Sequence, residues 1–349
     1  MKIGIVDPYF DAYGGGESYM LTLAGHLSTK HDVTVFWDDA NMLSEANKRF
    51  GIDVSKIKIT QNIFRGTSLL KKSLVTRQYD CIIFLTDGSI PLSLANRNIL
   101  HIQVPCSRLS FPIWKRAIYS NVIFNSEFTK AHSDRSVWKK STVIYPPVST
   151  ADIKPCSKRE KIILSVGRFS PYHSVKKQDV LIDAFVRAKK EGKFLGYTLV
   201  LAGGMGENDR EFFRSLKDKA RDFPIRFYPN IGRSDLVHLY GSAKIYWHAA
   251  GFGETDPSLM EHFGISTVEA MAGGCAVLSY KAGGQEEIIT EGVNGFLWNS
   301  IKELLDKTDR VIRDESLYGT ITKAAGKKAR EYSVQRFGKS WDTIIGNNI

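Results

Sequence analysis

Two glutamates eight residues apart flank the start of a predicted helix within the stretch Glu254–Gly274. Apolar spacing predicts that helix from Ile265 to Ala272, directly after Gly264. The first N–H groups of a helix lack partners inside it and carry partial positive charge, so they suit a phosphate. Glu261 precedes the helix and Glu269 lies more than one turn inside it, where each carboxylate could accept ligand hydroxyls. We therefore expect a phosphate site between two carboxylates; the alternative is a structural helix with capped glutamates.

A second candidate site follows the first predicted strand, Lys2–Val6. There Gly14-Gly15-Gly16-Glu17 opens an amphipathic helix that runs through Leu27. The order of strand, glycine-rich loop and helix begins a nucleotide-binding βαβ unit, in which glycines let the backbone approach a ligand. The spacing is not Gly-x-Gly-x-x-Gly and no Gly-Lys-Ser/Thr follows, which argues against a dinucleotide fingerprint and against a nucleotidase phosphate loop. The alternative is a tight turn without a ligand.

Length and charge limit the classes of protein to consider. A chain of 349 residues should form about two domains, because single cores rarely grow beyond ~250–300 residues. The net charge of +11 is spread over both halves. This distribution favours a solvated basic surface over a nucleic-acid stripe, and it fits an anionic substrate or an anionic membrane surface equally well.

The four cysteines are far apart and show no spacing typical of a zinc site. Cys81 and Cys275 begin apolar runs, so we expect core thiols and a reducing compartment. The N-terminal apolar run is too short for a secretory signal, and no run approaches the ~18 residues that cross a bilayer. The predicted location is the cytoplasm, with peripheral attachment to the inner face of the membrane as a further candidate.

Apolar runs alternate with helical stretches in both halves, which predicts two α/β, mostly parallel, doubly wound sheets. Pro146-Pro147 closes the first half, and residues 148–160 have the composition of a linker. We expect an N-terminal domain in residues 1–150, a second domain in 151–330, and a C-terminal helix in 331–349 that packs back towards the first. The predicted strands are Lys2–Val6, Val33–Trp37, Cys81–Leu85, Ile99–Val104, Val122–Phe124, Thr142–Tyr145, Lys161–Val166, Thr198–Ala202, Ile225–Tyr228, Ile245–His248 and Ala276–Tyr280.

Two basic and apolar stretches of the first half suit a membrane interface. The stretch Ser68–Arg77 combines four apolar residues with three cations. The second cluster consists of Arg108, Phe111, Trp114, Lys115 and Arg116. The alternative for both is an ordinary surface helix over a core.

The order and spacing of several motifs resemble family 4 of the retaining nucleotide-sugar glycosyltransferases. The matching segments of the second half are 165–169, Lys176 with 178–185, 261–265, 269–272, 283–284 and 292–297. In the first half they are 14–17, 125–129 and 145–147. The resemblance spans roughly residues 1–300 and is closest to the branch of cytosolic mannosyltransferases that extend lipid-linked oligosaccharides. It implies a GT-B fold, with two Rossmann-like domains facing across a cleft.

The resemblance also implies roles for individual residues. Arg168 and Lys176 would bind the donor diphosphate and neutralise its charge as the sugar leaves. Glu261 would hold sugar hydroxyls, and Glu269 would hold the ribose hydroxyls. No metal ion or cofactor is expected, because cationic side chains and a helix dipole replace it. The remaining predicted donor-binding residues are Gly15, Gly16, Gly167, His262, Phe263, Gly264 and Ile265.

One departure from the family concerns a histidine near the reaction centre. In the family it lies in a segment similar to Tyr-Val-His-Tyr-Pro, and here the corresponding run places Gln103 at its position. His101 lies two residues earlier, on the same face of a strand. Three explanations remain open: His101 or a register shift supplies the role, Gln103 acts by hydrogen bonding alone, or the acceptor needs no histidine. His101 could also be a satisfied core residue.

The sequence thus predicts a metal-independent, retaining hexosyltransferase. Its donor would be a GDP or UDP sugar carrying mannose, glucose or N-acetylglucosamine, bound mainly to the second domain. A glycan or lipid-linked acceptor would bind to the first. The alternatives are a non-catalytic nucleotide-sugar or glycan-binding protein and a nucleotide-sugar epimerase or hydrolase of the same fold. Nucleic acid is not an expected partner, because no recognition motif accompanies the basic charge.

Overall fold

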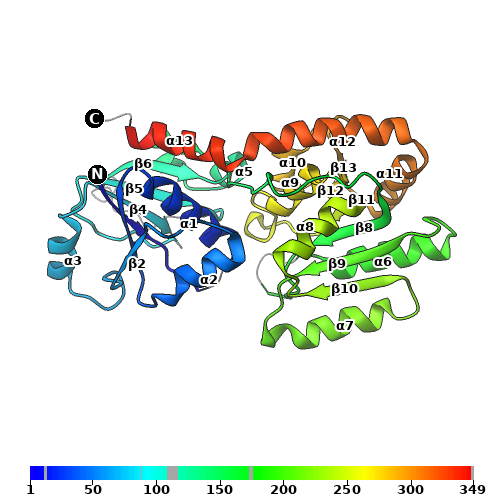
Figure 1. The fold of residues 1–349 in the computed structure, drawn as a ribbon, viewed down its shortest axis with the longest axis horizontal. Coiled ribbons are helices and arrows are strands. Elements are labelled where there is room, and N and C mark those ends of the chain that lie inside the picture. Colours follow the sequence, from blue (N-terminus) through cyan, green and yellow to red (C-terminus); the bar gives the residue numbers. More distant parts are fainter. Residues whose placement is uncertain (12–13, 87, 108–116, 173–175, 347–349) are drawn as a thin grey trace. The chain divides into compact units, whose positions relative to one another are not determined.

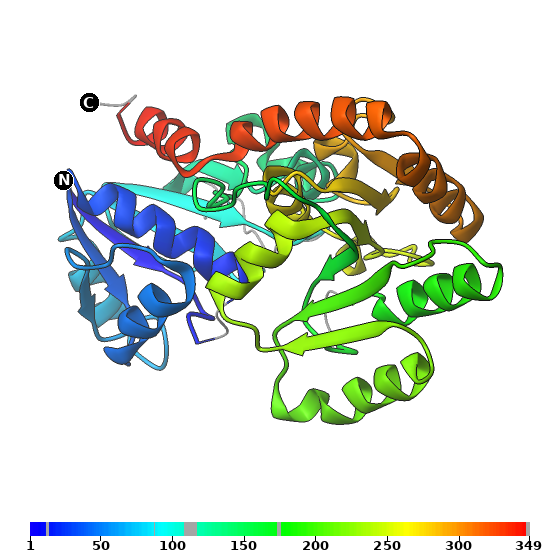
Figure 2. The ribbon, with the colours of Figure 1, turned by 45° about the vertical axis from the view of Figure 1, so that its right-hand side comes forward.

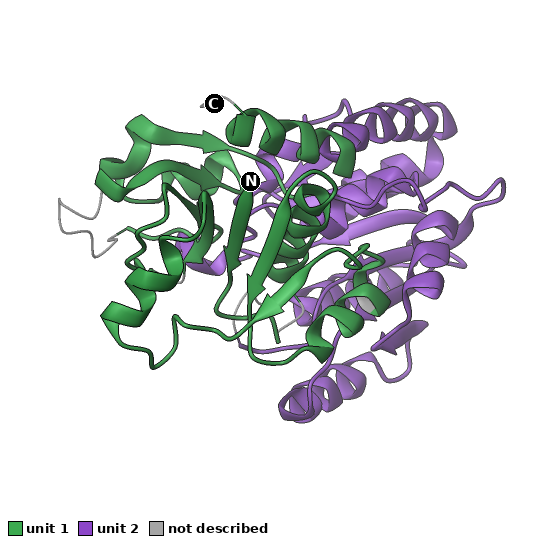
Figure 3. Cartoon of the chain, turned by 60° about the vertical axis from the view of Figure 1, so that its left-hand side comes forward, with its two compact units in different colours: residues 1–147, 334–349 green, residues 148–333 purple. Residues whose placement is uncertain are grey.

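The strands of this chain pair in parallel in two separate sheets, as the alternation of strands and helices predicts (Figure 1). The computed structural model describes residues 1–11, 14–86, 88–107, 117–172 and 176–346. These divide into unit 1, Met1–Pro147 with Val334–Ile349, and unit 2, Val148–Ser333 (Figure 3). The basic-aromatic cluster predicted around Arg108, Phe111, Trp114, Lys115 and Arg116 lies outside the described residues. Among the described helices, none has both the length and the apolarity required to cross a bilayer.

Unit 1 contains a seven-stranded sheet in the order β3-β2-β1-β4-β5-β6-β7. Its strands are β1 Lys2–Val6, β2 Asp32–Phe36, β3 Lys58–Thr60, β4 Cys81–Thr86, β5 Arg97–Ile102, β6 Tyr119–Phe124 and β7 Ser141–Val143. Its helices are α1 Gly15–Ser28, α2 Asn41–Phe50, α3 Leu69–Thr76, α5 Glu127–Ala131 and α13 Val334–Gly346. Side chains of the inner strands β1, β2, β4, β5 and β6 enter two different apolar clusters, so both faces of the central sheet are buried, as expected for parallel strands.

The C-terminal helix α13 belongs to unit 1 and lies beside α1 (Figure 3). Trp341 is fully buried, and its indole N–H donates to the hydroxyl of Tyr19 over 3.1 Å. Asp342 accepts from His26 at 2.9 Å and from Lys30 at 2.8 Å. Phe337, Trp341 and Ile345 of α13 also belong to one apolar cluster with residues of α1. This cluster and the two contacts of Asp342 hold α13 on the same face of the sheet as α1.

Unit 2 contains a six-stranded sheet in the order β10-β9-β8-β11-β12-β13. Its strands are β8 Glu160–Val166, β9 Thr198–Gly203, β10 Ile225–Pro229, β11 Ala243–His248, β12 Ala276–Tyr280 and β13 Phe296–Trp298. Its helices are α6 Gln178–Lys190, α7 Arg210–Ala220, α8 Arg233–Ser242, α9 Ile265–Ala272, α10 Gln285–Ile288, α11 Ile301–Arg313 and α12 Glu315–Ala329. Helices α6 and α7 lie side by side and share one apolar cluster with the central strands (Figure 2).

Most predicted strands are confirmed to within a few residues, and the two predicted core thiols are buried. Two differences are informative. The sequence did not indicate β3 or β13, each of which has three residues. Strand β5 ends at Ile102, so the predicted strand end at Val104 is wrong and Gln103 lies just beyond the sheet.

A buried carboxyl group follows β1 directly. Asp7 has no exposed surface, and its Oδ1 accepts from the backbone N–H of Tyr9 at 2.8 Å. Its Oδ2 has no hydrogen-bond partner among the described residues. Burial, reinforced by the nearby charge of Glu17, raises the pKa of Asp7 to about 8. The folded chain therefore holds this group protonated at neutral pH.

We expect the stability of the chain to decrease as the pH rises from about 4 to about 8. Across this range the unfolded chain has lost the Asp7 proton, whose ordinary pKa is 3.8, while the folded chain still holds it. Each pH unit lowers the free energy of unfolding by at most ~1.4 kcal/mol. The variant Asp7→Asn should lose this decline in thermal unfolding scans at pH 5, 6.5 and 8. The control is Asp235→Asn, because Asp235 is exposed and is not among the charges that act on Asp7, and an equal change in both variants would contradict the assignment.

Candidate functional site

In the unit 2 sheet, β9 and β10 are added on one side of β8, and β11, β12 and β13 are added on the other side. The strand order therefore reverses between β8 and β11. Ligands of such sheets bind at the carboxyl ends of the strands beside this point. Arg168 and Lys176 follow β8, and His248 is the last residue of β11. The predicted glutamate Glu261 lies between β11 and α9. The fold thus brings four polar side chains to the expected edge.

Glu261 is the centre of this group. Its Oε2 accepts from the ammonium of Lys176 at 2.7 Å and from Nε2 of His248 at 2.9 Å. A carboxylate only accepts hydrogen bonds, so Nε2 of His248 carries the proton. Burial alone would raise the pKa of Glu261, but the Lys176 charge and the His248 hydrogen bond outweigh it and hold this pKa well below its usual range. The result is a permanently ionised carboxylate whose second oxygen, Oε1, has no hydrogen-bond partner in the described part of the chain.

The backbone on both sides of Glu261 is fixed by glycines and by an amide side chain. Gly264 adopts φ 121°, a conformation that other residues rarely reach, and this allows the turn into α9. The N–H of Gly284 donates to the carbonyl of Glu261 at 2.8 Å. Gln285 donates to the carbonyl of Phe263 at 3.1 Å and accepts from the hydroxyl of Thr267 at 2.9 Å. These bonds hold the loop and the first turn of α9 in one arrangement.

The N-terminus of α9 has donors without acceptors. The N–H groups of Thr267 and Val268 both donate to the carbonyl of Gly264. Among the described residues, none accepts from the N–H groups of Ile265 and Ser266, and no side chain caps the helix. Within the described residues, the predicted anion site therefore has free donors, and it begins four residues after Glu261 in sequence.

The other predicted residues of unit 2 fall around this core. Arg168 is exposed, and its guanidinium makes no hydrogen bond or ion pair with a described residue. A Cβ on Gly167 would lie 2.6 Å from Cγ of Lys176, so this glycine admits the lysine stem. His262 donates from Nε2 to the carbonyl of Ser258 at 3.2 Å, and burial lowers its pKa.

Glu269 lies apart from the group around Glu261 in its contacts. It is buried and forms an ion pair with Arg233, the first residue of α8. Arg233 also pairs with Asp152, with 3.1 Å between Nη2 and Oδ2. Its predicted role towards ribose hydroxyls stays a prediction. A ligand at Glu269 would contact a carboxylate whose charge is already neutralised by Arg233.

In unit 1 the structure brings Gly16, His101 and Gln103 together. His101 is fully buried and stacks on Tyr19 with 4.0 Å between the ring centroids. Its Nδ1 lies 3.1 Å from the carbonyl of Ile123, which only accepts, so Nδ1 carries the proton and Nε2 accepts from the Gln103 amide at 2.8 Å. Burial lowers the pKa of His101 to about 3. Both ring nitrogens of His101 are thus engaged within the protein, and Gln103 also donates weakly to the carbonyl of Gly16 at 3.5 Å. The roles of His101 and Gln103 towards a ligand stay predictions.

The loop before α1 is held by its own acidic residue. The backbone N–H of Gly14 donates to a carboxylate oxygen of Glu17 at 2.5 Å, and the helix begins at Gly15. The predicted glycine-rich turn into a helix is thus confirmed. The contact of Gly15 and Gly16 with a ligand stays a prediction.

No group of three or more histidine, cysteine or acidic side chains in the described part of the chain is arranged to hold a metal ion. The prediction that the protein needs no metal is not tested by this. Among the described residues, Lys176, Arg168 and the start of α9 bring positive charge to the carboxyl edge of the unit 2 sheet.

Sequence reasoning missed two residues of unit 2, His248 and Arg233. His248 is the last residue of a strand that the apolar pattern does predict. Because ligands bind at the carboxyl ends of such strands, this position could have indicated His248 as a site residue. Arg233 follows Gly232 at the start of a helix, and nothing in the local sequence links it to Glu269. Only the fold shows that pairing.

Comparison with known proteins identifies the family. The sequence profile described as "Glycosyl transferases group 1" matches residues 151–330, which is more than half of the chain and nearly all of unit 2. The chain belongs to the group 1 glycosyl transferases. The site around Glu261 thus lies within the part of this glycosyl transferase that defines its family.

Relatives and solved structures agree with this family and with a GT-B fold. An uncharacterized glycosyltransferase of Haemophilus influenzae is 23% identical, with 99% of each chain covered. A GDP-Man:Man(3)GlcNAc(2)-PP-Dol alpha-1,2-mannosyltransferase of Dictyostelium discoideum is 28% identical over 63% of this chain. The match covers 44% of that relative, so the chain spans less than half of it. Anabaena HepE, solved with UDP, superposes with a TM-score of 0.76 at 21% identity, covering 99% of this chain and 100% of HepE.

Proposed function

We propose that this protein is a retaining, metal-independent hexosyltransferase of family 4 that takes a hexose from a nucleotide-diphosphate sugar. The observation that carries the proposal is the ionised Glu261, held by Lys176 and His248, on the loop that leads into α9. The first N–H groups of α9 have no acceptor among the described residues. A carboxylate accepts sugar hydroxyls, and a helix start with two nearby cations accepts a diphosphate. One ligand class combines both needs, and it is the sugar nucleotide.

In the proposed reaction the bond between the anomeric carbon and the diphosphate oxygen breaks, and its electron pair stays on that oxygen. Arg168, two further N–H groups of Lys176 and the start of α9 stabilise the growing negative charge. The acceptor oxygen attacks the anomeric carbon from the side the diphosphate leaves. Its proton passes to the departing phosphate oxygen, so the anomeric configuration is kept. No metal ion is needed, because these residues already supply positive charge.

The choice of donor rests on the relatives. The name of the Dictyostelium discoideum relative specifies GDP-mannose, whereas HepE was solved with UDP and with UDP-glucose. We place GDP-mannose first because that relative has the higher identity, with UDP sugars as the second candidates. The acceptor is a glycan or lipid-linked saccharide, and the protein works in the cytoplasm, attached peripherally to a membrane.

Calorimetric titration with GDP and UDP, followed by mass spectrometry of products with a panel of acceptors, tests the proposal. We expect one nucleotide to bind and a hexose adduct to form with retained configuration. An altered free sugar nucleotide without an adduct would favour the epimerase, and released hexose would favour the hydrolase. Nucleotide binding without turnover on any acceptor would favour the non-catalytic binding protein.

The membrane part of the proposal rests on the surface of α3. Leu69, Leu70 and Leu74 of this helix are 64%, 79% and 67% exposed, although leucine usually packs inside. Lys71 and Arg77 are exposed on the same short segment. Exposed leucines next to cations are the pattern of a helix that lies in the surface of an anionic bilayer.

We expect the double variant Leu70→Ser, Leu74→Ser to bind vesicles of phosphatidylglycerol and phosphatidylcholine at least ~10-fold more weakly, since burial of each leucine contributes ~1.5–3 kcal/mol. Vesicle sedimentation at two salt concentrations measures this. Leu195→Ser removes a leucine that is 78% exposed in unit 2 and should change nothing. Equal losses in both variants, or no vesicle binding by the natural sequence, would exclude α3 as the contact.

A further inference from the structure

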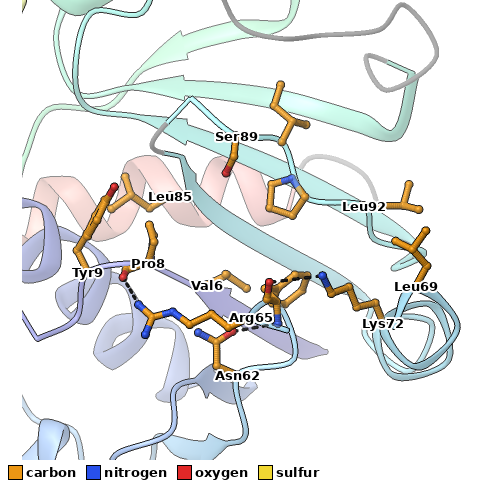
Figure 4. Close-up of a pocket in the computed structure, with 13 residues that line it drawn as sticks. Val6, Pro8, Tyr9, Asn62, Arg65, Leu69, Lys72, Leu85, Ser89 and Leu92 are labelled. Carbon is orange, nitrogen blue, oxygen red and sulfur yellow. Dashed lines mark hydrogen bonds between the residues drawn. The ribbon is translucent and has the colours of Figure 1, made fainter. Parts of the chain in front are cut away.

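A cavity of about 470 Å³ opens at the carboxyl edge of the unit 1 sheet (Figure 4). It lies beside the ends of β1 and β4, where the strand order of this sheet reverses. Its volume falls within the range of small-molecule sites, ~300–1,000 Å³. The site around Glu261 belongs to unit 2, so no residue of it lines this cavity. The lining residues are Val6, Pro8, Tyr9, Asn62, Phe64, Arg65, Leu69, Lys72, Leu85, Ser89, Ile90, Pro91 and Leu92.

Most of the wall is apolar, and its charged side chains are both cations. Figure 4 shows Arg65 and Lys72 along one side of the cavity, with Ser89 across from them. Arg65 donates from Nη2 to the carbonyl of Pro8 at 2.5 Å and lies 4.7 Å above the ring of Trp37. Lys72 donates to the carbonyl of Phe64 at 3.4 Å. Neither cation forms an ion pair with a described carboxylate, so both charges remain available to an anion.

The apolar wall continues onto the surface through α3. Leu69 lines the cavity and is 64% exposed, and Leu70 and Leu74 follow it on the same helix. An apolar chain lying against Leu69 could therefore extend from the cavity onto the leucines proposed to enter the bilayer. A soluble sugar would leave this apolar wall unused.

We propose that this cavity binds an amphiphile, with a phosphate between Arg65 and Lys72 and the adjoining apolar chain against Phe64, Leu69 and Leu85. This inference rests on the proposed function and narrows it: the acceptor carries its phosphate next to a lipid chain. Unpaired cations attract the phosphate, and guanidinium and ammonium groups bind it by charge-assisted hydrogen bonds. The apolar wall then distinguishes this ligand from free phosphate.

Calorimetric titration with decyl phosphate, below its micelle concentration, tests this site without any assay of transfer. We expect saturable binding, with inorganic phosphate and 1-decanol each at least tenfold weaker. The double variant Arg65→Gln, Lys72→Gln should lose at least tenfold in affinity. The matched control Lys71→Gln, Arg77→Gln removes the same charge at two positions that do not line the cavity, and it should bind as before. Thermal unfolding of all variants checks that they fold.

Several results would overturn the inference. If inorganic phosphate binds as tightly as decyl phosphate, the cavity is only an anion site. If 1-decanol binds as tightly, the cavity is only an apolar site. An equal loss in the control would assign the effect to the surface charge of α3. Titration with GDP and UDP separates this inference from the proposed function. Nucleotide binding without decyl phosphate binding overturns only the cavity, whereas the reverse overturns the proposed transferase.

Discussion

The variant Glu261→Gln is expected to lower kcat/KM for the sugar nucleotide by about 100- to 1,000-fold, the usual effect of removing one preorganised polar group from a reaction centre. Glutamine keeps the size of the side chain but removes the charge that organises Lys176 and His248. Its amide has one acceptor instead of two, so it cannot accept from both neighbours and from a sugar hydroxyl as well. Both neighbours would then be free to turn towards other acceptors.

Initial rates with varied donor concentration measure this effect, and Glu254→Gln is the matched control. Glu254 lies in the same loop and pairs with Lys177 at 2.5 Å, so the control also removes one carboxylate from one lysine. We expect less than a threefold change in the control. Similar losses in the two variants would indicate a general loosening of the loop, and near-normal turnover by Glu261→Gln would refute the role of Glu261.

The fold was predictable where the sequence repeats a strong pattern. Strands such as β1 and β4 are continuous apolar runs because both faces of a parallel sheet are buried, and such runs are easily recognised. The strands β3 and β13 have only three residues each. Three residues carry too little periodicity to distinguish a strand from a loop, and their pairing is decided by the neighbouring strand.

Lys176 and Glu261 were both singled out from the sequence, but their contact with each other and with His248 was not. The start of α9 was indicated by Gly264 and the apolar spacing that follows it. The contact between Lys176 and Glu261 joins residues 85 positions apart, and Arg233 meets Glu269 across 36 positions. Such distances along the chain are closed only by the order of strands in the sheet, which local sequence does not specify.

The position of Gln103 shows the same limit in unit 1. On sequence, His101 and Gln103 were alternatives for one role. The structure joins them by a hydrogen bond and buries the histidine, so the two act as one unit in which His101 orients Gln103. The sequence could not distinguish a buried His101 from one that faces a ligand. Alternation along a strand predicts on which face of the sheet a side chain lies, but not whether other residues cover that face.

The variant Arg168→Gln is expected to lower kcat about 100-fold with little change in the temperature of unfolding. Arg168 is exposed and its guanidinium makes no polar contact with a described residue, so removing the guanidinium leaves no described partner unpaired. The Gln178 amide donates to the backbone carbonyl of residue 168, which the variant keeps. The effect of this variant therefore measures only the contribution of Arg168 to ligand binding and to stabilisation of the transition state. Because the charge on the diphosphate grows as the sugar leaves, the contact is strongest in the transition state, and kcat should fall more than donor affinity.

Lys176→Gln provides the contrast that makes this prediction specific. That change also leaves Glu261 without its ammonium partner, so the pKa of Glu261 should rise and the unfolding temperature should fall together with the rate. Arg226→Gln, an exposed arginine on β10 at the far edge of the sheet, is the matched control. Single-turnover rates and affinities for nucleoside mono- and diphosphates distinguish the three variants. If Arg168→Gln weakens mono- and diphosphate binding equally and leaves the chemical step unchanged, the arginine does not contact the leaving group.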